Sequence, residues 1–162
     1  MIKQRTILTE NFVQDAVVRY LDKKGWSKCL NSAKLHEHGV DIKVKNNKVG
    51  RYWLIEVKGD PKAKVKSPAG SRSSSFNSAI GQIITRMHSN RSEKYRDCYH
   101  GYKYGIAFST YFRDMVIKKV PFNVLRRLCL YIFFVDKKGD MEEINWRKLK
   151  KIQKDILLLK NK

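Results

Sequence analysis

The chain has few acidic residues, few prolines and few cysteines for its length. No apolar run is long enough to span a membrane, since the longest covers only residues 128–135. The first ten residues, MIKQRTILTE, lack the apolar stretch of a signal peptide. The three cysteines are far apart and lack the paired spacing of a metal site. These absences exclude a membrane-spanning protein and a disulfide framework, and they predict a reducing, cytoplasmic location.

The scarcity of acidic residues leaves a large positive charge. Only 15 Asp and Glu residues oppose 35 Lys and Arg residues, so the net charge is +20. Such an excess indicates an anionic partner, because Lys and Arg neutralise the phosphates of nucleic acids. A nucleic acid is therefore the first expectation. A ribosome-associated protein and a membrane-surface binder are the alternatives that charge alone leaves open.

The length of 162 residues predicts a single domain, residues 1–162, with enough chain to bury a core. We expect its core over about residues 9–135 and a C-terminal strand and helix extension over about 136–162. Apolar periodicity and turn residues predict a mixed α/β protein. The expected helices cover residues 9–24, 75 to the mid-90s, 122–127 and 146–160, and the expected strands cover 26–34, 39–45, 54–59, 102–109 and 128–135.

Two neighbouring segments, GVDIKVK (39–45) and LIEVKG (54–59), predict a β-hairpin with a functional face. A turn centred between residues 48 and 49 places Asp41 opposite Glu56. The alternation of side chains then separates two faces. The apolar face contains Val40, Ile42, Val44, Trp53, Ile55 and Val57. The polar face contains Asp41, Lys43, Lys45, Tyr52, Glu56 and Lys58.

The polar face carries a pattern suited to metal-assisted chemistry. Carboxylates that face each other across two strands repel, so Asp41 and Glu56 favour a bound cation. Mg²⁺ binds one or two carboxylates and keeps several waters, and the backbone carbonyl of Val57 is a further candidate ligand. Lys58 lies two residues beyond Glu56 on the same face, where its ammonium can stabilise charge on a phosphate. A surface hairpin with scattered charges is the plainer interpretation of the same pattern.

Residues 60–75, DPKAKVKSPAGSRSSS, predict a basic loop directly after Lys58. Such a loop either closes over a phosphate backbone or is simply solvated. The next helix has a polar face that includes Gln82 and Arg86. We assign nucleic-acid contacts to the cations of these two segments: Lys62, Lys64, Lys66, Arg72 and Arg86.

The hairpin motif, with a helix before it and a helix after it, resembles the PD-(D/E)XK nuclease superfamily. Asp41 matches the first acid of that motif, Glu56 the second and Lys58 the lysine. The Gly-Val that precedes Asp41 resembles the Mrr-like and Holliday-junction-resolvase-like branches. The resemblance covers roughly residues 9–109. It implies a restriction-endonuclease-like core with αβββαβ order, Mg²⁺ as cofactor with Mn²⁺ as a substitute, and a prokaryotic or mobile-element origin.

The resemblance also draws attention to three further residues. Many members carry an acid in the first helix, and Gln14 occupies that place here, so the chain departs from the resolvase-like branch. Glu10 lies one turn earlier and is the accessory candidate, although it also suits a helix N-terminus. Gln82 matches a glutamine that lines the active site in several branches, and a solvated helix face is the alternative.

The reaction that the resemblance implies is Mg²⁺-dependent hydrolysis of phosphodiester bonds in DNA, duplex or branched, in restriction, repair or recombination. A homodimer is expected, because cutting both strands of a duplex favours two sites. The alternative is a non-catalytic nucleic-acid-binding module that has kept the nuclease fold.

Overall fold

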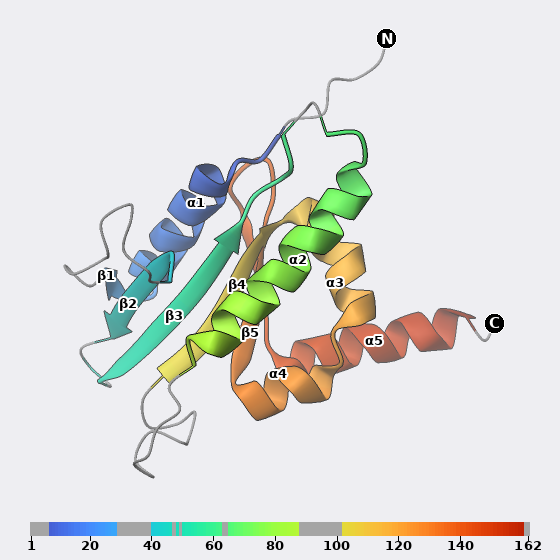
Figure 1. Ribbon diagram of the computed structural model, residues 1–162. Coiled ribbons are helices and arrows are strands. Elements are labelled where there is room, and N and C mark those ends of the chain that lie inside the picture. The colour runs from blue at the N-terminus through green and yellow to red at the C-terminus, as the bar shows by residue number, and fades with distance from the viewer. Residues whose placement is uncertain are drawn as a thin grey trace.

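The computed structural model describes residues 7–28, 40–46, 48, 50–62, 65–87 and 102–160. These residues form one six-stranded sheet with helices on both faces (Figure 1). In chain order the elements are α1 (Glu10–Lys23), β1 (Ser27–Lys28), β2 (Ile42–Asn46), β3 (Arg51–Lys58), α2 (Pro68–Thr85), β4 (Tyr102–Ser109), η2 (Thr110–Phe112), α3 (Arg113–Lys119), α4 (Phe122–Leu128), β5 (Leu130–Val135), β6 (Met141–Ile144) and α5 (Trp146–Lys160). The expected α/β class, the αβββαβ order and the C-terminal helix are confirmed.

The six strands lie side by side in chain order. β1, β2 and β3 form an antiparallel unit, β3, β4 and β5 run parallel, and β6 is antiparallel to β5. The parallel pair of β3 and β4 is joined through a connection that contains α2, as parallel pairing requires a long crossover. The C-terminal ends of β3, β4 and β5 therefore share one edge of the sheet.

Each face of the sheet covers its own apolar core. One core lies under α1, whose buried side chains Val13, Val17 and Leu21 pack on the hairpin residues. The other lies under α2 to α5 and is rich in phenylalanine. β3 has apolar residues on both of its faces, so its side chains are buried almost continuously along the strand.

The hairpin register agrees with the sequence-based expectation where strand pairing is formed. Ile42 pairs with Ile55 and Val44 with Trp53, and all four belong to the core under α1. Asp41 is a bend residue just outside β2, so it is not in the ladder opposite Glu56. Val40 was wrongly assigned to the face under α1. It packs against the other core, because the alternation ends at that bend.

Two other boundaries differ from the expectation. The segment 60–75 was predicted as a loop, but α2 begins at Pro68, and the Ser67 hydroxyl caps it by accepting from the Gly70 amide at 3.2 Å. Proline is favoured in a first helical turn, so its effect was misread as loop-forming. The segment 111–119, for which neither a helix nor a strand was expected, is helical, and β6 lies in the C-terminal extension over residues 136–162, where a strand was expected. Predicted structure in residues 29–39 and 88–101 lies outside the described residues.

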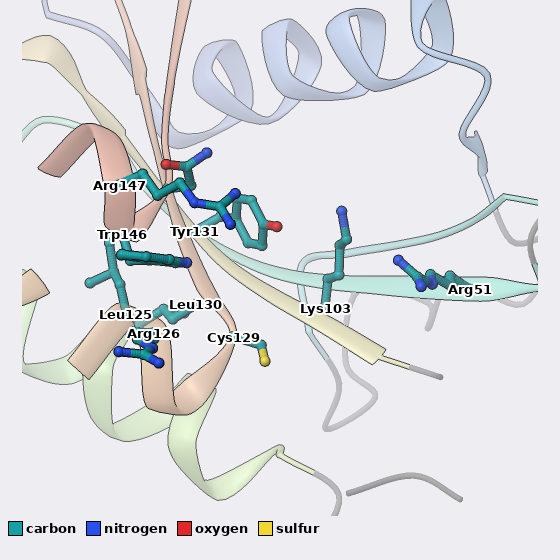
Figure 2. A pocket seen from close by; sticks show the side chains of 10 residues that line it. Arg51, Lys103, Leu125, Arg126, Cys129, Leu130, Tyr131, Trp146 and Arg147 are labelled. Atoms are coloured by element: carbon teal, nitrogen blue, oxygen red, sulfur yellow. The ribbon is translucent and has the colours of Figure 1, made fainter. Parts of the chain in front are cut away.

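The two ends of the parallel strands differ in their side chains. Glu56 and Lys58 stand at the end of β3, next to α1 and α2. At the other end, where β3, β4 and β5 begin, a cavity of about 170 Å³ opens beside the start of α5 (Figure 2). The sheet thus carries one polar site at each end of its parallel strands.

Candidate active site

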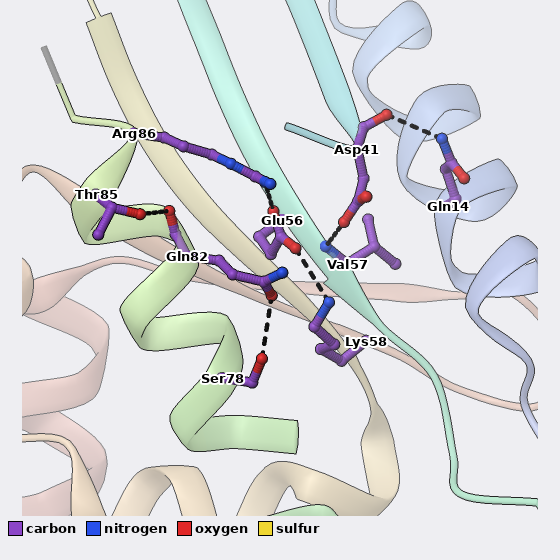
Figure 3. A network of polar contacts seen from close by, with 9 residues as sticks. All are labelled: Gln14, Asp41, Glu56, Val57, Lys58, Ser78, Gln82, Thr85 and Arg86. Carbon is purple, nitrogen blue, oxygen red and sulfur yellow. Dashed lines mark hydrogen bonds and ion pairs between the residues drawn. The ribbon is translucent and has the colours of Figure 1, made fainter. Parts of the chain in front are cut away.

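Glu56 is a buried carboxylate at the end of β3. It is only 1% exposed, because α2 packs across this part of the strand. Its Oε1 accepts a hydrogen bond from Lys58 Nζ at 3.0 Å, and its Oε2 pairs with the guanidinium of Arg86 (Figure 3). Arg86 is the C-cap residue of α2. Both carboxylate oxygens are therefore occupied by cations, one from the strand and one from the helix.

Asp41 is held between α1 and β3. Its Oδ2 accepts a hydrogen bond from the Val57 amide at 2.6 Å, and its backbone carbonyl accepts from Gln14 Nε2 at 2.9 Å. Oδ1 has no hydrogen bond to another described residue. Gln14, predicted as a possible accessory residue, thus positions the Asp41 backbone.

The charges of this site act on one another. Burial raises the pKa of Glu56, and the negative charge of Asp41 raises it further, while Lys58 and Arg86 oppose that rise. A raised pKa means that the buried carboxylate still lacks part of the positive charge that its ionised form requires. A cation bound beside Glu56 would stabilise its ionised form.

Glu10 belongs to the same electrostatic group, although the residue as a whole is exposed. Desolvation raises its pKa, Lys58 lowers it, Asp41 raises it, and a hydrogen bond from the Gly59 amide lowers it. Glu10 is also the acidic residue in the first turn of α1. The helix-terminal role and the accessory role are thus compatible in one residue.

Gly59 allows the start of α1 to approach the end of β3. A Cβ atom at this position would lie 2.3 Å from the backbone nitrogen of Glu10 and 2.6 Å from the carbonyl carbon of Thr9. Real Cβ atoms do not approach backbone atoms so closely, and backbone atoms cannot rotate away. Glycine is therefore required here for close backbone approach.

Asp60 fastens this approach with three hydrogen bonds. Its amide donates to the Leu8 carbonyl at 2.7 Å, and its Oδ2 accepts from the Leu8 amide at 3.2 Å. Its Oδ1 accepts from the buried hydroxyl of Ser109 at 3.0 Å, at the end of β4. Three segments that are distant in the sequence thus meet beside Lys58. We call the group Leu8, Gly59, Asp60 and Ser109 the backbone clasp. The hydrogen bond from the Gly59 amide to Glu10 is its fourth hydrogen bond.

Gln82 extends from α2 toward Glu56 and Lys58 (Figure 3). Its Oε1 accepts from the Ser78 hydroxyl at 3.3 Å, one turn earlier, and its backbone carbonyl accepts from the Thr85 hydroxyl. The side chain is half-buried. Its position agrees with the sequence-based prediction that it faces the site, while its role stays a prediction.

The cations predicted to contact nucleic acid differ in their exposure to solvent. Lys62 and Lys66 are exposed before α2, and Lys64 lies outside the described residues. Arg72 is on α2, and its Nη1 is buried without a hydrogen-bond partner among the described residues. Arg86 is engaged with Glu56, so it is bound into the site rather than free on the surface.

The sequence did not reveal Arg86 as the partner of Glu56, nor the clasp, nor the cations of the distant cavity. Thirty residues separate Arg86 from Glu56, and the helix end that joins them could not be placed. The only signal for the clasp was the Gly-Asp pair that follows Lys58. The cavity collects cations from positions 51 to 147, which no local pattern connects.

Among the described residues, no group of three or more His, Cys, Asp and Glu side chains is arranged to hold a metal ion. No helix in that part of the chain is long and apolar enough to cross a membrane.

Cys129 is disulfide-bonded, whereas a reducing environment was expected from the sequence.

Two solved structures are similar to this chain. One is an XisH family protein from Nostoc punctiforme PCC 73102, with 16% identity and a TM-score of 0.49, covering 82% of this chain and 98% of that one. The other is an fdxN element excision controlling factor protein from Anabaena variabilis, with 21% identity, a TM-score of 0.50 and the same coverage. No protein-family model and no curated protein matches. The second likeness shows the fold alone, a mixed α/β sheet flanked by helices with a C-terminal helix, which agrees with the expected α/β class.

Proposed function

We propose that this protein is a metal-dependent DNA endonuclease of the PD-(D/E)XK type. The observation that carries the proposal is the convergence of Asp41, Glu56 and Lys58 at the end of β3, within the expected element order. Lys58 contacts Glu56 directly, and the Asp41 charge acts on Glu56. A scattered surface hairpin would not bury one of its carboxylates to 1% exposure.

The donors at this site fit Mg²⁺, with Mn²⁺ as a substitute. Mg²⁺ takes hard oxygen ligands, uses one or two carboxylates and keeps waters, so two acids suffice. Asp41 and Glu56 would hold it. The Val57 carbonyl would join them, because the N–H and C=O of one strand residue face the same edge and its N–H faces Asp41. When bound, the metal would polarise a phosphoryl oxygen and lower the pKa of a coordinated water.

The residues of the chain have separate tasks in this proposal. Lys58 stabilises the charge that develops on the phosphate, and it holds Glu56 in place. Gln82 orients water or phosphate from the α2 side. Gln14 holds the Asp41 backbone against α1. Lys62, Lys66 and Arg72 contact the DNA backbone, and their contribution depends on salt.

Arg86 must move before a metal ion can bind to Glu56 Oε2. It occupies Glu56 Oε2, the atom that a metal ligand would offer. Its side chain is 27% exposed, so it has a path to solvent. We propose that Arg86 leaves Glu56 when the metal binds and then turns toward the DNA phosphate. This gives one physical basis for the sequence-based assignment of Arg86 to nucleic-acid binding.

The biological setting is proposed more broadly. The Anabaena protein of similar fold is named as an fdxN element excision controlling factor protein. Cleavage during excision or rearrangement of DNA is therefore one setting for this chain, together with restriction and repair. Duplex or branched DNA is the proposed partner, and a homodimer would present two sites to the two strands.

The rival function is nucleic-acid binding without catalysis. One observation favours it: both oxygens of Glu56 are already neutralised by Lys58 and Arg86. A site that uses its own cations in this way can be a purely structural ion pair. The rival predicts DNA binding that neither Mg²⁺ nor loss of Asp41 alters.

The deciding experiment incubates the protein with supercoiled, linear, branched and single-stranded DNA and with RNA, in Mg²⁺, in Mn²⁺ and in EDTA. The wild type is compared with Asp41→Ala and Lys58→Ala. Lys154→Ala, at an exposed position of α5, is the control for loss of one positive charge. We expect metal-dependent cutting in the wild type and the control only. Tight DNA binding without cutting in any metal, unchanged by Asp41→Ala, would overturn the proposal.

A further inference from the structure

A second polar site lies at the other end of the parallel strands. The cavity of about 170 Å³ is lined by residues from β3, β4, β5, α4 and the start of α5. Its cations are Arg51, Lys103, Arg126 and Arg147, and we call the cavity the basic pocket. Seven residue steps separate Arg51 from Lys58 along β3, which is about 23 Å at 3.3 Å per residue. The basic pocket is therefore separate from the candidate active site.

The described residues that line the basic pocket include four cations and no carboxylate. None of the four makes an ion pair with an acidic side chain of the described residues. The nearest acid that acts on Lys103 is Glu143, whose Oε2 already accepts from Lys24 Nζ at 2.9 Å and from the Tyr20 hydroxyl at 2.8 Å. Within the part of the chain that the structure describes, the cations of the pocket thus have no acidic side chain as an ion-pair partner.

Lys103 is the most enclosed of these cations. Its Nζ lies 4.9 Å from the ring centroids of Trp53 and Tyr131 and 5.7 Å from that of Trp26. Burial lowers its pKa, Glu143 raises it, and Arg51 lowers it. Aromatic rings hold an ammonium by weak cation–π attraction but supply no hydrogen-bond acceptor of full charge. An anion in the pocket would provide that acceptor.

Two of the other three cations, Arg126 and Arg147, lie against Trp146. The guanidinium groups of Arg147 and Arg126 lie 4.9 Å and 5.4 Å from its ring centroid. Figure 2 shows Arg147, Tyr131, Lys103 and Arg51 following one another along the pocket. Asn145 caps α5 by accepting from the Lys148 amide at 3.0 Å, so the positive end of this 15-residue helix adds to the same field.

The basic character of the pocket is not simply that of every hollow in a basic chain. Another cavity, beside α3 and α5, contains one cation, with Ile117, Ile156 and Leu157 as its apolar lining. The volume also limits the ligand. Sites for drug-sized molecules measure about 300–1,000 Å³. A space of about 170 Å³ accepts a small anion or one charged end of a larger molecule.

We propose that the basic pocket binds a phosphate group, either as free phosphate or as the terminal phosphate of a nucleic acid strand. The guanidinium fork of Arg147 matches the oxygens of a phosphate in pairs, Lys103 adds a point charge from within, and Arg126, across the Trp146 ring from Arg147, adds to the positive field. The start of α5 contributes its dipole. Phosphate binding in the basic pocket does not depend on whether the residues at the opposite end of the sheet cut DNA.

The three tryptophans of the chain give a direct readout. Trp146 lines the pocket, and Trp26 and Trp53 surround Lys103, so intrinsic fluorescence reports on this place. The titration uses inorganic phosphate, with chloride at the same ionic strength as reference. A 5′-phosphorylated oligonucleotide and its unphosphorylated twin form the second arm, with binding measured by anisotropy of a 3′ label.

The variants are Arg126→Gln and Arg147→Gln, which are exposed and leave the core intact, and Lys103→Gln. Lys154→Gln, outside the pocket, controls for a lost charge. We expect Arg147→Gln to weaken phosphate binding about tenfold, as the loss of a charge-assisted hydrogen bond predicts, and Arg126→Gln to weaken it less, because that arginine contributes only to the field. Tighter binding of the phosphorylated oligonucleotide identifies the strand end as the source, and equal binding of the twins identifies free phosphate. A phosphate response no greater than that of chloride, or an equal loss in Lys154→Gln, would overturn the proposal.

Discussion

β3 and β4 carry two polar sites at their two ends, and the sites differ in how their charges are balanced. At the C-terminal end, Asp41 and Glu56 face Lys58 and Arg86, so acids and cations nearly match. At the N-terminal end, the described lining of the basic pocket holds four cations and no carboxylate. A nearly balanced site can exchange one cation for another, whereas an unbalanced site needs an anion from outside. The same sheet therefore presents a candidate metal site and a candidate phosphate site.

The largest expected effect separates the two ends by function. Lys58→Ala should lower DNA cleavage about 10²–10³-fold, as loss of a group that stabilises transition-state charge does. It should leave phosphate binding in the basic pocket unchanged. The ends lie about 23 Å apart by strand rise, and charges are screened over about 10 Å at 0.1 M salt. Parallel cleavage assays and phosphate titrations test this. If Lys58→Ala weakens phosphate binding as much as Arg147→Gln does, the ends are not independent.

Gly59→Ala tests whether the acid-bearing end depends on close backbone approach. The added Cβ would collide with the backbone of Thr9 and Glu10, so the start of α1 must shift. Overpacking of this kind costs about 1–3 kcal/mol in free energy of unfolding, measured by urea denaturation.

Gly81→Ala in α2 is its matched control. A Cβ there meets nothing within 4 Å, and alanine should stabilise the helix by about 0.5–1 kcal/mol. Equal effects of the two substitutions would contradict the role given to Gly59.

Arg86→Gln tests the exchange of cations at the balanced site. Without added metal, Glu56 loses a partner, and the free energy of unfolding should fall by about 1–3 kcal/mol. Mg²⁺ should then raise the melting temperature of the variant more than that of the wild type, because binding to the folded state alone is stabilising.

The control is Arg113→Gln, which breaks a more exposed pair with Glu142 at 2.8 Å and should cost only about 0.2–1 kcal/mol. An equal Mg²⁺ response of Arg86→Gln, Arg113→Gln and the wild type would show that Arg86 and the metal do not compete.

The smallest expected effect is a difference in pH dependence between two glutamates. The pKa of Glu56 is raised above 4.5 by burial and by Asp41, so its contribution to stability is lost as pH rises from 4.5 through the folded-state pKa. The pKa of Glu142 is lowered from 4.5, chiefly by its hydrogen bond from Arg113, so its contribution is present above 4.5 and lost as pH falls through the folded-state pKa.

Glu56→Gln and Glu142→Gln should therefore change the slope of unfolding free energy against pH in opposite directions. Denaturation between pH 3 and 8 measures both slopes. Slopes of the same sign in the two variants would contradict the difference between the buried and the exposed carboxylate.

The fold and the motif could be predicted because their signals are local. Each of these signals spans only a few neighbouring residues of the sequence. They are helix caps such as Thr9, the alternation of apolar residues around Ile42 and around Ile55, and the Glu-Val-Lys sequence. The expected register Ile42–Ile55 was correct for this reason. The start of α2 was missed because Pro68 is typical both of loops and of first helical turns.

The remaining features depend on tertiary packing. Arg86 reaches Glu56 only because the end of α2 lies over β3, and Asp41 turns to the Val57 amide only because the chain bends before β2. The basic pocket joins residues that are almost one hundred positions apart. No residue pattern within one element contains this information.

The backbone clasp forms late in the folding of the chain. Its hydrogen bonds join residues 52 and 49 positions apart, and the loops between them must close before the bonds can form. Contacts of such long range form slowly during folding. On a ribosome, the clasp cannot close until Ser109 has emerged, long after Asp41, Glu56 and Lys58. A chain still being synthesised thus holds all the residues of the motif before it holds their final arrangement.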